Sequence, residues 1–155
     1  MRRYLLVFLA ILFPATAQAE QFSGKPRIVN GYTLEVAGTQ VVLWGINAPN
    51  KEETCPSSKD KPVTCGIVAK RTLGILIQGN SITCETKGKS ATGLPTAVCK
   101  LDRFDVAEQL VMTGWAVAYP VESKRYLYPQ KTAKITKSGM WKSKKFKPED
   151  IQGRK

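Results

Sequence analysis

Histidine is missing from this 155-residue sequence, and acidic residues are scarce. Histidine is the commonest general base near neutral pH and the commonest transition-metal ligand, so serine-histidine triads and histidine zinc sites are excluded. Only 12 Asp and Glu residues stand against 24 Lys and Arg residues, which gives a formal net charge of +12. A surface of this sign favours polyanions such as nucleic acid, lipid head groups or acidic polysaccharide, and the charge alone does not choose among them.

The first nineteen residues resemble a targeting signal. Arg2 and Arg3 precede a largely apolar run over residues 4–17, and Ala17, Gln18 and Ala19 form a small-residue cleavage motif. We therefore expect a signal peptide over residues 1–19 that is cleaved near Ala19, and a periplasmic or secreted mature chain. An uncleaved anchor would need about 20 apolar residues, and Pro14 breaks this shorter run. Cleavage would leave a net charge of +10 and no stable membrane span.

All four cysteines follow this signal: Cys55, Cys65, Cys84 and Cys99. An even number in an oxidising compartment favours two disulfides, whereas a zinc site of four thiolates would want C-x-x-C spacings, which the sequence lacks. Three pairings are possible. We favour Cys55 with Cys65 and Cys84 with Cys99, because each would close a short loop or join neighbouring strands. Each closure would contribute about 3 kcal/mol by the chain-entropy model.

Alternating apolar residues and turn signals predict five strands, over residues 25–30, 32–38, 39–46, 80–86 and 95–101. Three helices are predicted. The first covers residues 65–79, with Gly79 at its end. The second starts at a D-x-x-E capping box of Asp105 and Glu108 and ends at Gly114. The third covers residues 129–141, with Gly139 at its C-cap. We expect a basic, flexible tail over residues 142–155.

Three strands, a helix, two strands and two helices form the order of an α+β protein with a five-stranded Greek-key OB-fold barrel. From Gly24 to Trp141 the chain resembles the staphylococcal nuclease, or thermonuclease-like, family. The resemblance lies in "IVNGYTLEVAGTQVVLWGINAPN", "DVAEQLVMTGWAVAY" and "KSGMW". The two cysteine pairs are similar to those of exported bacterial branches of the family. The predicted nuclease-like domain spans residues 20–141.

The resemblance implies calcium-dependent cleavage of phosphodiesters, yet every catalytic position departs from the family pattern. The carboxylates of the family's D-G-D-T hairpin fall at Asn30 and Tyr32. Its two phosphate-gripping arginines fall at Val42 and Leu94. Its calcium-binding aspartate falls at Asn47, and its water-ordering glutamate falls at Asn50. We expect no calcium to bind, because calcium needs six to eight oxygens with several carboxylates. Glu52 and Glu53 follow Asn50 in a polar loop and are not expected to replace the lost base.

The leading hypothesis is therefore a catalytically inactive, exported binding or structural module. Residues 123–148 hold nine lysines and arginines and no carboxylate, so a polyanion is the expected ligand. The candidate cations are Lys124, Arg125, Lys131, Lys134, Lys142, Lys144 and Lys145, with Tyr126, Tyr128 and Trp141 as stacking surfaces. Alternatively, these aromatic residues pack against the barrel and the lysines are simply solvated. Two further hypotheses are a metal-dependent phosphodiesterase with a rebuilt site and a protein-partner role in envelope or exopolysaccharide assembly.

Overall fold

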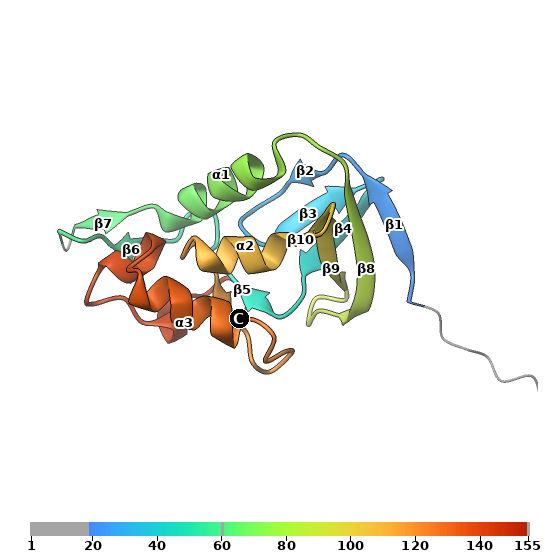
Figure 1. Cartoon of the computed structure of the whole chain (residues 1–155). Coiled ribbons are helices and arrows are strands. Elements are labelled where there is room, and N and C mark those ends of the chain that lie inside the picture. Colours follow the sequence, from blue (N-terminus) through green and yellow to red (C-terminus); the bar gives the residue numbers. More distant parts are fainter. Residues whose placement is uncertain (1–18, 60, 155) are drawn as a thin grey trace, which may run out of the picture.

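A computed structural model describes residues 19–59 and 61–154 (Figure 1). The predicted signal peptide, residues 1–19, therefore lies outside the described residues except for Ala19. Among the described residues, every helix is too short or too polar to cross a lipid bilayer.

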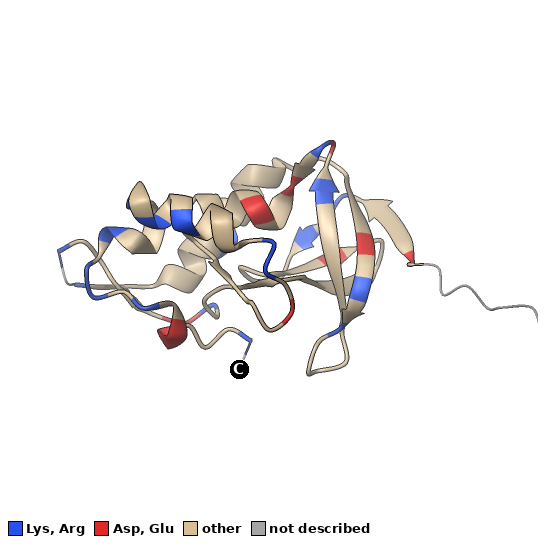
Figure 2. Cartoon of the chain, turned by 60° about the horizontal axis from the view of Figure 1, so that its bottom comes forward, with Lys and Arg blue, Asp and Glu red and all other residues tan. Residues whose placement is uncertain are grey.

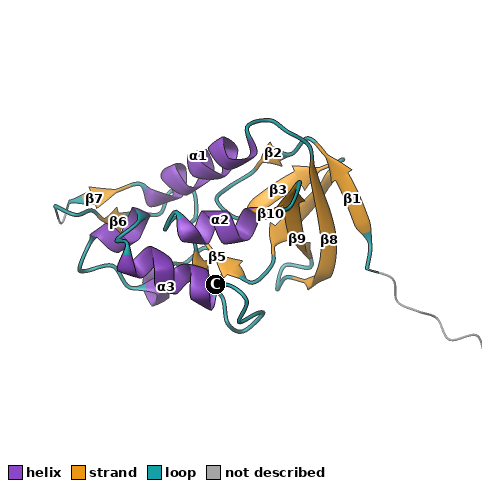
Figure 3. Cartoon of the chain, in the orientation of Figure 1, coloured by secondary structure: helices purple, strands orange, loops and turns teal. Residues whose placement is uncertain are grey.

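A seven-stranded mixed sheet forms one end of the molecule (Figure 3). Its strands are β1 (Gln21–Gly24), β2 (Arg27–Ile28), β3 (Thr33–Val36), β4 (Thr39–Leu43), β8 (Ile82–Lys89), β9 (Pro95–Leu101) and β10 (Phe104–Asp105). The order is β1-β8-β9-β4-β3-β2, with β10 on β9, and only the β4–β9 pair is parallel. A methyl group added at Gly24 would lie 3.5 Å from the nitrogen of Ala37, so β1 curls back towards the end of β3. This curved sheet with its helices has the predicted α+β class.

The β3–β4 hairpin follows the sequence prediction closely. Its register pairs Val36 with Thr39, and the two turn residues, Ala37 and Gly38, have φ angles of +49° and +80°. Two positive φ angles characterise the tight turn that matches the twist of antiparallel strands. The hairpin buries one face completely: Leu34, Val36, Val41 and Leu43 have no exposed surface.

The strand predicted over residues 39–46 is wrong at its end, because the chain turns at Gly45. Strand β4 stops at Leu43, and β5 (Ile46–Asn47) pairs instead with β11 (Val117–Ala118). Gly45 has a φ of +74°, and a methyl group there would lie 2.8 Å from Cε2 of Tyr126. Only glycine combines this backbone angle with so close an approach.

In the described part of the chain, three α-helices lie beside the sheet, as predicted: α1 (Cys65–Ile77), α2 (Val106–Met112) and α3 (Leu127–Ile135). In Figure 1, α2 lies between α1 and α3. The third helix ends earlier than the predicted C-cap at Gly139, which instead begins a short 3-10 helix, η1 (Gly139–Lys142). A methyl group at Gly139 would lie 2.5 Å from the carbonyl oxygen of Gly114, so contact with the end of α2 fixes this turn.

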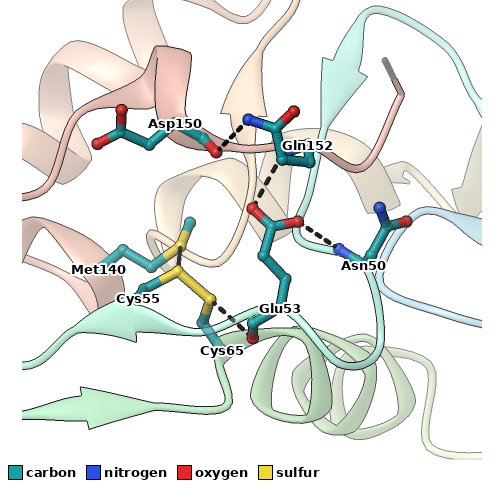
Figure 4. The surroundings of a disulfide bond; sticks show 7 residues. All are labelled: Asn50, Glu53, Cys55, Cys65, Met140, Asp150 and Gln152. Carbon is teal, nitrogen blue, oxygen red and sulfur yellow. Dashed lines mark hydrogen bonds between the residues drawn. A yellow bond between two sulfur atoms is a disulfide. The ribbon is translucent and has the colours of Figure 1, made fainter.

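Both predicted disulfides are present, Cys55 with Cys65 and Cys84 with Cys99. Cys84 and Cys99 are opposite one another on β8 and β9. Cys55 lies in β6 (Cys55–Pro56), which pairs with β7 (Pro62–Val63), and its disulfide ties this hairpin to the start of α1 (Figure 4).

Residues 142–154, predicted to be a flexible tail, are folded against the domain in the structure. The tail contains η2 (Pro148–Asp150), and two of its apolar side chains, Phe146 and Ile151, are buried. They join a small apolar cluster with Met140, and Trp141 packs against it. Burying each such side chain stabilises the fold by roughly 1.5–3 kcal/mol. The prediction of a flexible tail relied on the many lysines and did not take these two apolar residues into account.

Asp105 connects α2 to the start of α3. Its Oδ1 accepts hydrogen bonds from the backbone N–H of Ala107 (3.0 Å) and Glu108 (3.2 Å), which caps α2 as predicted. Its Oδ2 accepts a hydrogen bond of 2.9 Å from the hydroxyl of Tyr126, a side chain with no exposed surface. Burial, and then the charge of Asp105, raise the pKa of Tyr126.

We predict that Asp105→Ala lowers the free energy of unfolding by about 2–4 kcal/mol, through the lost cap and the unsatisfied tyrosine hydroxyl. Urea unfolding followed by circular dichroism measures this. Asp105→Asn keeps an acceptor for the cap and should lose less than half as much. An alanine variant within about 0.5 kcal/mol of the parent would contradict the assigned role.

Candidate functional site

The sequence resemblance assigns the family's catalytic residues to six positions, and all of these except Leu94 lie near the turn between β4 and β5. The first of them, Asn30, precedes β3, and its Oδ1 accepts hydrogen bonds from the backbone N–H of Tyr32 (2.9 Å) and Thr33 (2.8 Å). This is an Asx turn, in which a short polar side chain replaces a backbone acceptor. Asn30 therefore shapes the entry to β3.

Of the six substituted positions, the structure brings four to one area: Tyr32, Val42, Asn47 and Asn50. Tyr32 and Val42 line a hollow of about 320 Å³, together with Lys89, Tyr119 and residues near them. The Tyr32 hydroxyl lies 3.1 Å from Oδ1 of Asn50. Asn47 is buried in β5. Leu94 is half-buried in the β8–β9 loop and does not line the hollow.

The C-terminal segment, Ile151–Arg154, lies across these positions. Asn47 donates a hydrogen bond of 3.4 Å from Nδ2 to the carbonyl of Ile151, and the Tyr32 hydroxyl donates to the carbonyl of Gly153. A methyl group on Gly153 would lie only 1.7 Å from the carbonyl oxygen of Ala48, so the two backbones are in direct contact. Burial raises the pKa of Tyr32, with Arg154 opposing the shift, so the hydroxyl remains a donor at neutral pH.

Arg154 fixes the end of this segment. Its guanidinium forms an ion pair with Glu122, with one Nη1–Oε2 distance of 2.7 Å, and donates to the carbonyl of Ile46 at 3.0 Å. The guanidinium carbon also lies 4.9 Å from the centre of the Tyr119 ring. Glu122 in turn accepts a hydrogen bond of 2.7 Å from the backbone N–H of Gly45, so it joins the turn after β4 to the C-terminal segment.

Glu53, the second of the two acidic residues after Asn50, is held by the backbone on both sides. Both carboxylate oxygens of Glu53 accept backbone hydrogen bonds of 2.9 Å, one from Asn50 and one from Gln152 (Figure 4). Glu52 is exposed in the turn before it. A carboxylate whose two oxygens already accept backbone protons is poorly placed to order an attacking water.

The residues at these positions do not fit calcium. The four positions assigned to the family's acids offer one phenol and three amides, whereas calcium takes six to eight oxygens with several carboxylates. Oδ1 of Asn47 is buried without a hydrogen-bond partner in the described part of the chain, but a methyl on Gly153 would lie 2.9 Å from it, so the C-terminal segment occupies the adjoining space. Within residues 19–59 and 61–154, no three His, Cys, Asp or Glu side chains gather as a metal site.

A second hollow, the basic groove, lies between α3 and the chain that follows it. It has a volume of about 540 Å³ and is lined by four lysines: Lys134, Lys137, Lys144 and Lys147. Trp141 and one carboxylate, Glu149, also line it. Figure 2 shows Lys and Arg gathered over α3 and the segment after it.

The predicted polyanion-binding residues are only partly brought together. Lys134 and Lys144 line the basic groove, whereas Lys142 lines a separate hollow beside Cys55. Arg125 forms an ion pair of 3.1 Å with Asp105. The remaining candidate cations are exposed but do not line the groove: Lys124, Lys131 and Lys145.

The aromatic candidates differ from one another. The prediction of Tyr126 as a binding residue is wrong, because its side chain is fully buried and its hydroxyl donates a hydrogen bond to Asp105. Trp141 packs edge-on against Phe146, with ring centres 5.0 Å apart, and Lys134 lies 5.9 Å from the Trp141 ring centre. Tyr128 is 78% exposed, and its role as a stacking surface stays a prediction.

Sequence reasoning missed Lys137 and Lys147, although both belong to the basic run that it identified. It also missed Glu122 and the C-terminal segment, for which the sequence carries no local signal.

The sequence matches a protein-family model and is similar to a known protein. Residues 40–143 match the family model described as "Staphylococcal nuclease homologue". The chain is also similar to "Succinoglycan biosynthesis protein ExoI" of Rhizobium meliloti (strain 1021). The identity is 29% over 128 residues, which cover 81% of this chain and 67% of that protein.

We predict that calcium does not stabilise the protein. A ligand present at a concentration near its dissociation constant raises the free energy of unfolding by only about 0.4 kcal/mol. About 10 mM calcium should therefore move the melting temperature by less than about 2 °C. Differential scanning fluorimetry measures this, with magnesium at equal concentration as the ionic-strength control. A saturable rise with calcium alone would show that the site still takes the ion.

Proposed function

Because the chain belongs to the staphylococcal nuclease homologue family, we propose that it uses the family's fold as a binding module without phosphodiesterase activity. The observation that carries this proposal is the state of the family's catalytic positions. Val42 and Leu94 supply no positive charge, and Tyr32, Asn47 and Asn50 supply no carboxylate. The C-terminal segment bonds to Tyr32 and Asn47.

The chemistry of phosphoryl transfer supports this proposal. Its transition state is stabilised mainly by positive charge around the phosphoryl oxygens, and one well-placed arginine is worth about three to five orders of magnitude in rate. The nearest guanidinium at the site, Arg154, is already paired with Glu122. Glu53, the nearest carboxylate to Asn50, is bonded to two backbone N–H groups.

We propose that the ligand is an acidic polymer of the cell envelope, bound in the basic groove. Four lysines line that groove beside the indole of Trp141, an arrangement that suits a negatively charged chain with flat or apolar faces. The similar protein from Rhizobium meliloti is named for succinoglycan biosynthesis, which favours an exopolysaccharide over a nucleic acid. The two disulfides are compatible with a location outside the cytoplasm.

The name of that relative also supports a second candidate function, a protein-partner role in exopolysaccharide assembly. In this role the domain would bind an assembly protein rather than the polymer itself. The two functions differ in whether the purified protein binds polymer directly.

The purified, oxidised chain that begins after Ala19 tests these functions. We expect no cleavage of single-stranded DNA or RNA with calcium, magnesium or manganese. We expect retardation in gels that contain an acidic polysaccharide such as alginate, and weaker retardation as salt is raised. Metal-dependent cleavage that survives stringent purification would instead indicate a rebuilt phosphodiesterase. Neither cleavage nor retardation would favour the protein-partner role.

Charge reversal locates the binding surface. We predict that Lys134→Glu with Lys144→Glu weakens polymer binding at least about tenfold, because two attractive contacts become repulsive and each tenfold step needs only 1.4 kcal/mol. Lys70→Glu with Arg71→Glu on α1 makes the same change in net charge, with α2 between it and α3 (Figure 1). An equal loss in both pairs would mean that net charge, rather than the basic groove, governs binding.

A further inference from the structure

We infer that the family's catalytic site has become, in this chain, a binding site for an extended peptide, and that its occupant is the chain's own C-terminal segment, Ile151–Arg154. This inference does not depend on what the basic groove binds. It rests on the contacts of the segment, on the space around Gly153 and on the chemistry of the residues that replace the family's acids.

Each of the four residues of the segment has a polar partner on the site. The contacts are Ile151 carbonyl with Asn47 Nδ2, Gln152 N–H with Glu53 Oε1, Gly153 carbonyl with the Tyr32 hydroxyl, and Arg154 guanidinium with Glu122 and the Ile46 carbonyl. Three of these bonds involve the peptide main chain, and one involves a charged side chain. Main-chain bonds with a few side-chain anchors are how proteins bind extended peptides.

The site also restricts the type of residue at two positions of the segment, 151 and 153. Ile151 is 1% exposed and belongs to the small apolar cluster that includes Phe146. Two residues further on, Gly153 is buried where any Cβ would collide with Ala48. The site therefore accepts an apolar residue followed, two positions later, by glycine and then by a cation.

The residues at the former acid positions suit a peptide better than a metal ion. A carboxylate at position 47 would face the carbonyl of Ile151 and repel it, whereas the amide of Asn47 donates a proton to it. A carboxylate at position 32 would likewise face the carbonyl of Gly153, where the Tyr32 hydroxyl now donates. The substitutions that remove the calcium ligands thus supply the donors that two peptide carbonyls need.

Occupancy by the segment changes the site physically. Gly153 and Arg154 form part of the wall of the 320 Å³ hollow next to Tyr32 and Val42. A phosphodiester approaching Asn47 would meet the backbone of Gly153, because that backbone touches Ala48. The segment therefore excludes substrate from the former catalytic positions without any contribution from another molecule.

Hydrogen exchange followed by mass spectrometry tests the inference on the full oxidised chain that begins after Ala19. In the parent protein, the amides of Ile151 and Gln152 should be protected, because they donate to the Pro148 carbonyl (3.3 Å) and to Oε1 of Glu53 (2.9 Å). Gly153→Ala forces a methyl group against Ala48 and should make these amides exchange at least about tenfold faster, since losing 1.4 kcal/mol of local stability has that effect. Gly74→Ala on α1 is the matched control, because it makes the same substitution at a position where a methyl group would have no atom within 4 Å.

Unprotected amides in the parent protein, or equal protection in both variants, would overturn the inference. Circular dichroism should show the same fold in all three proteins, so that any difference in exchange belongs to the segment. These readouts need no ligand, so a failure here is separate from a failure of polymer binding.

Peptide addition provides a second, independent test. The full oxidised chain with Gly153→Ala, whose own segment should be displaced, should bind a synthetic peptide of residues 151–155 saturably, as measured by isothermal titration calorimetry. The same peptide with Gly153→Ala should show no saturable binding. Equal binding of both peptides, or of neither, would overturn the proposed site.

Discussion

The contact between Tyr126 and Gly45 is the constraint on which the rest of the site depends. Tyr126 is fully buried, and its ring lies where a side chain at position 45 would have to be. Glycine has no Cβ, so position 45 can both accommodate this ring and adopt the positive φ that turns the chain out of β4 into β5. Because Asp105 holds the Tyr126 hydroxyl, the cap of α2 and the path of residues 46–50 are fixed by one buried side chain.

The turn at Gly45 also positions Glu122, which forms the ion pair with Arg154 of the C-terminal segment. The backbone of Gly45 bonds on both sides to the loop before Tyr126: its carbonyl accepts from Tyr119 at 2.8 Å, and its N–H donates to Glu122 at 2.7 Å. Glu122 is thus held in position before Arg154 arrives, so little side-chain entropy is lost in forming the ion pair. A scaffold that orients a strand end for catalysis in the family serves here to orient an acceptor for an arginine.

Features set by neighbouring residues could be predicted from the sequence, and features set by distant contacts could not. The β3–β4 turn follows from Ala37 and Gly38, and the start of α2 follows from Asp105, because each depends on residues within one turn. The break at Gly45 depends on Tyr126, far along the chain. The contacts of Asn47 with Ile151 and of Tyr32 with Gly153 span 104 and 121 residues, and the lysines around the segment suggest a solvated tail. The family resemblance located the substituted positions but carried no information about their new partner.

The energetics of the C-terminal segment are close to balanced. Ordering four residues costs about 4–8 kcal/mol of backbone entropy. Burial of Ile151 contributes roughly 2–3 kcal/mol, and the four polar contacts contribute about 0.5–1.5 kcal/mol each. A net gain of a few kcal/mol or less holds the segment in place while leaving it exchangeable, unlike a core strand. Single contacts therefore have large effects, and the close approach of Gly153 to Ala48, which allows all four contacts at once, decides whether the segment occupies the area around Tyr32 and Asn47.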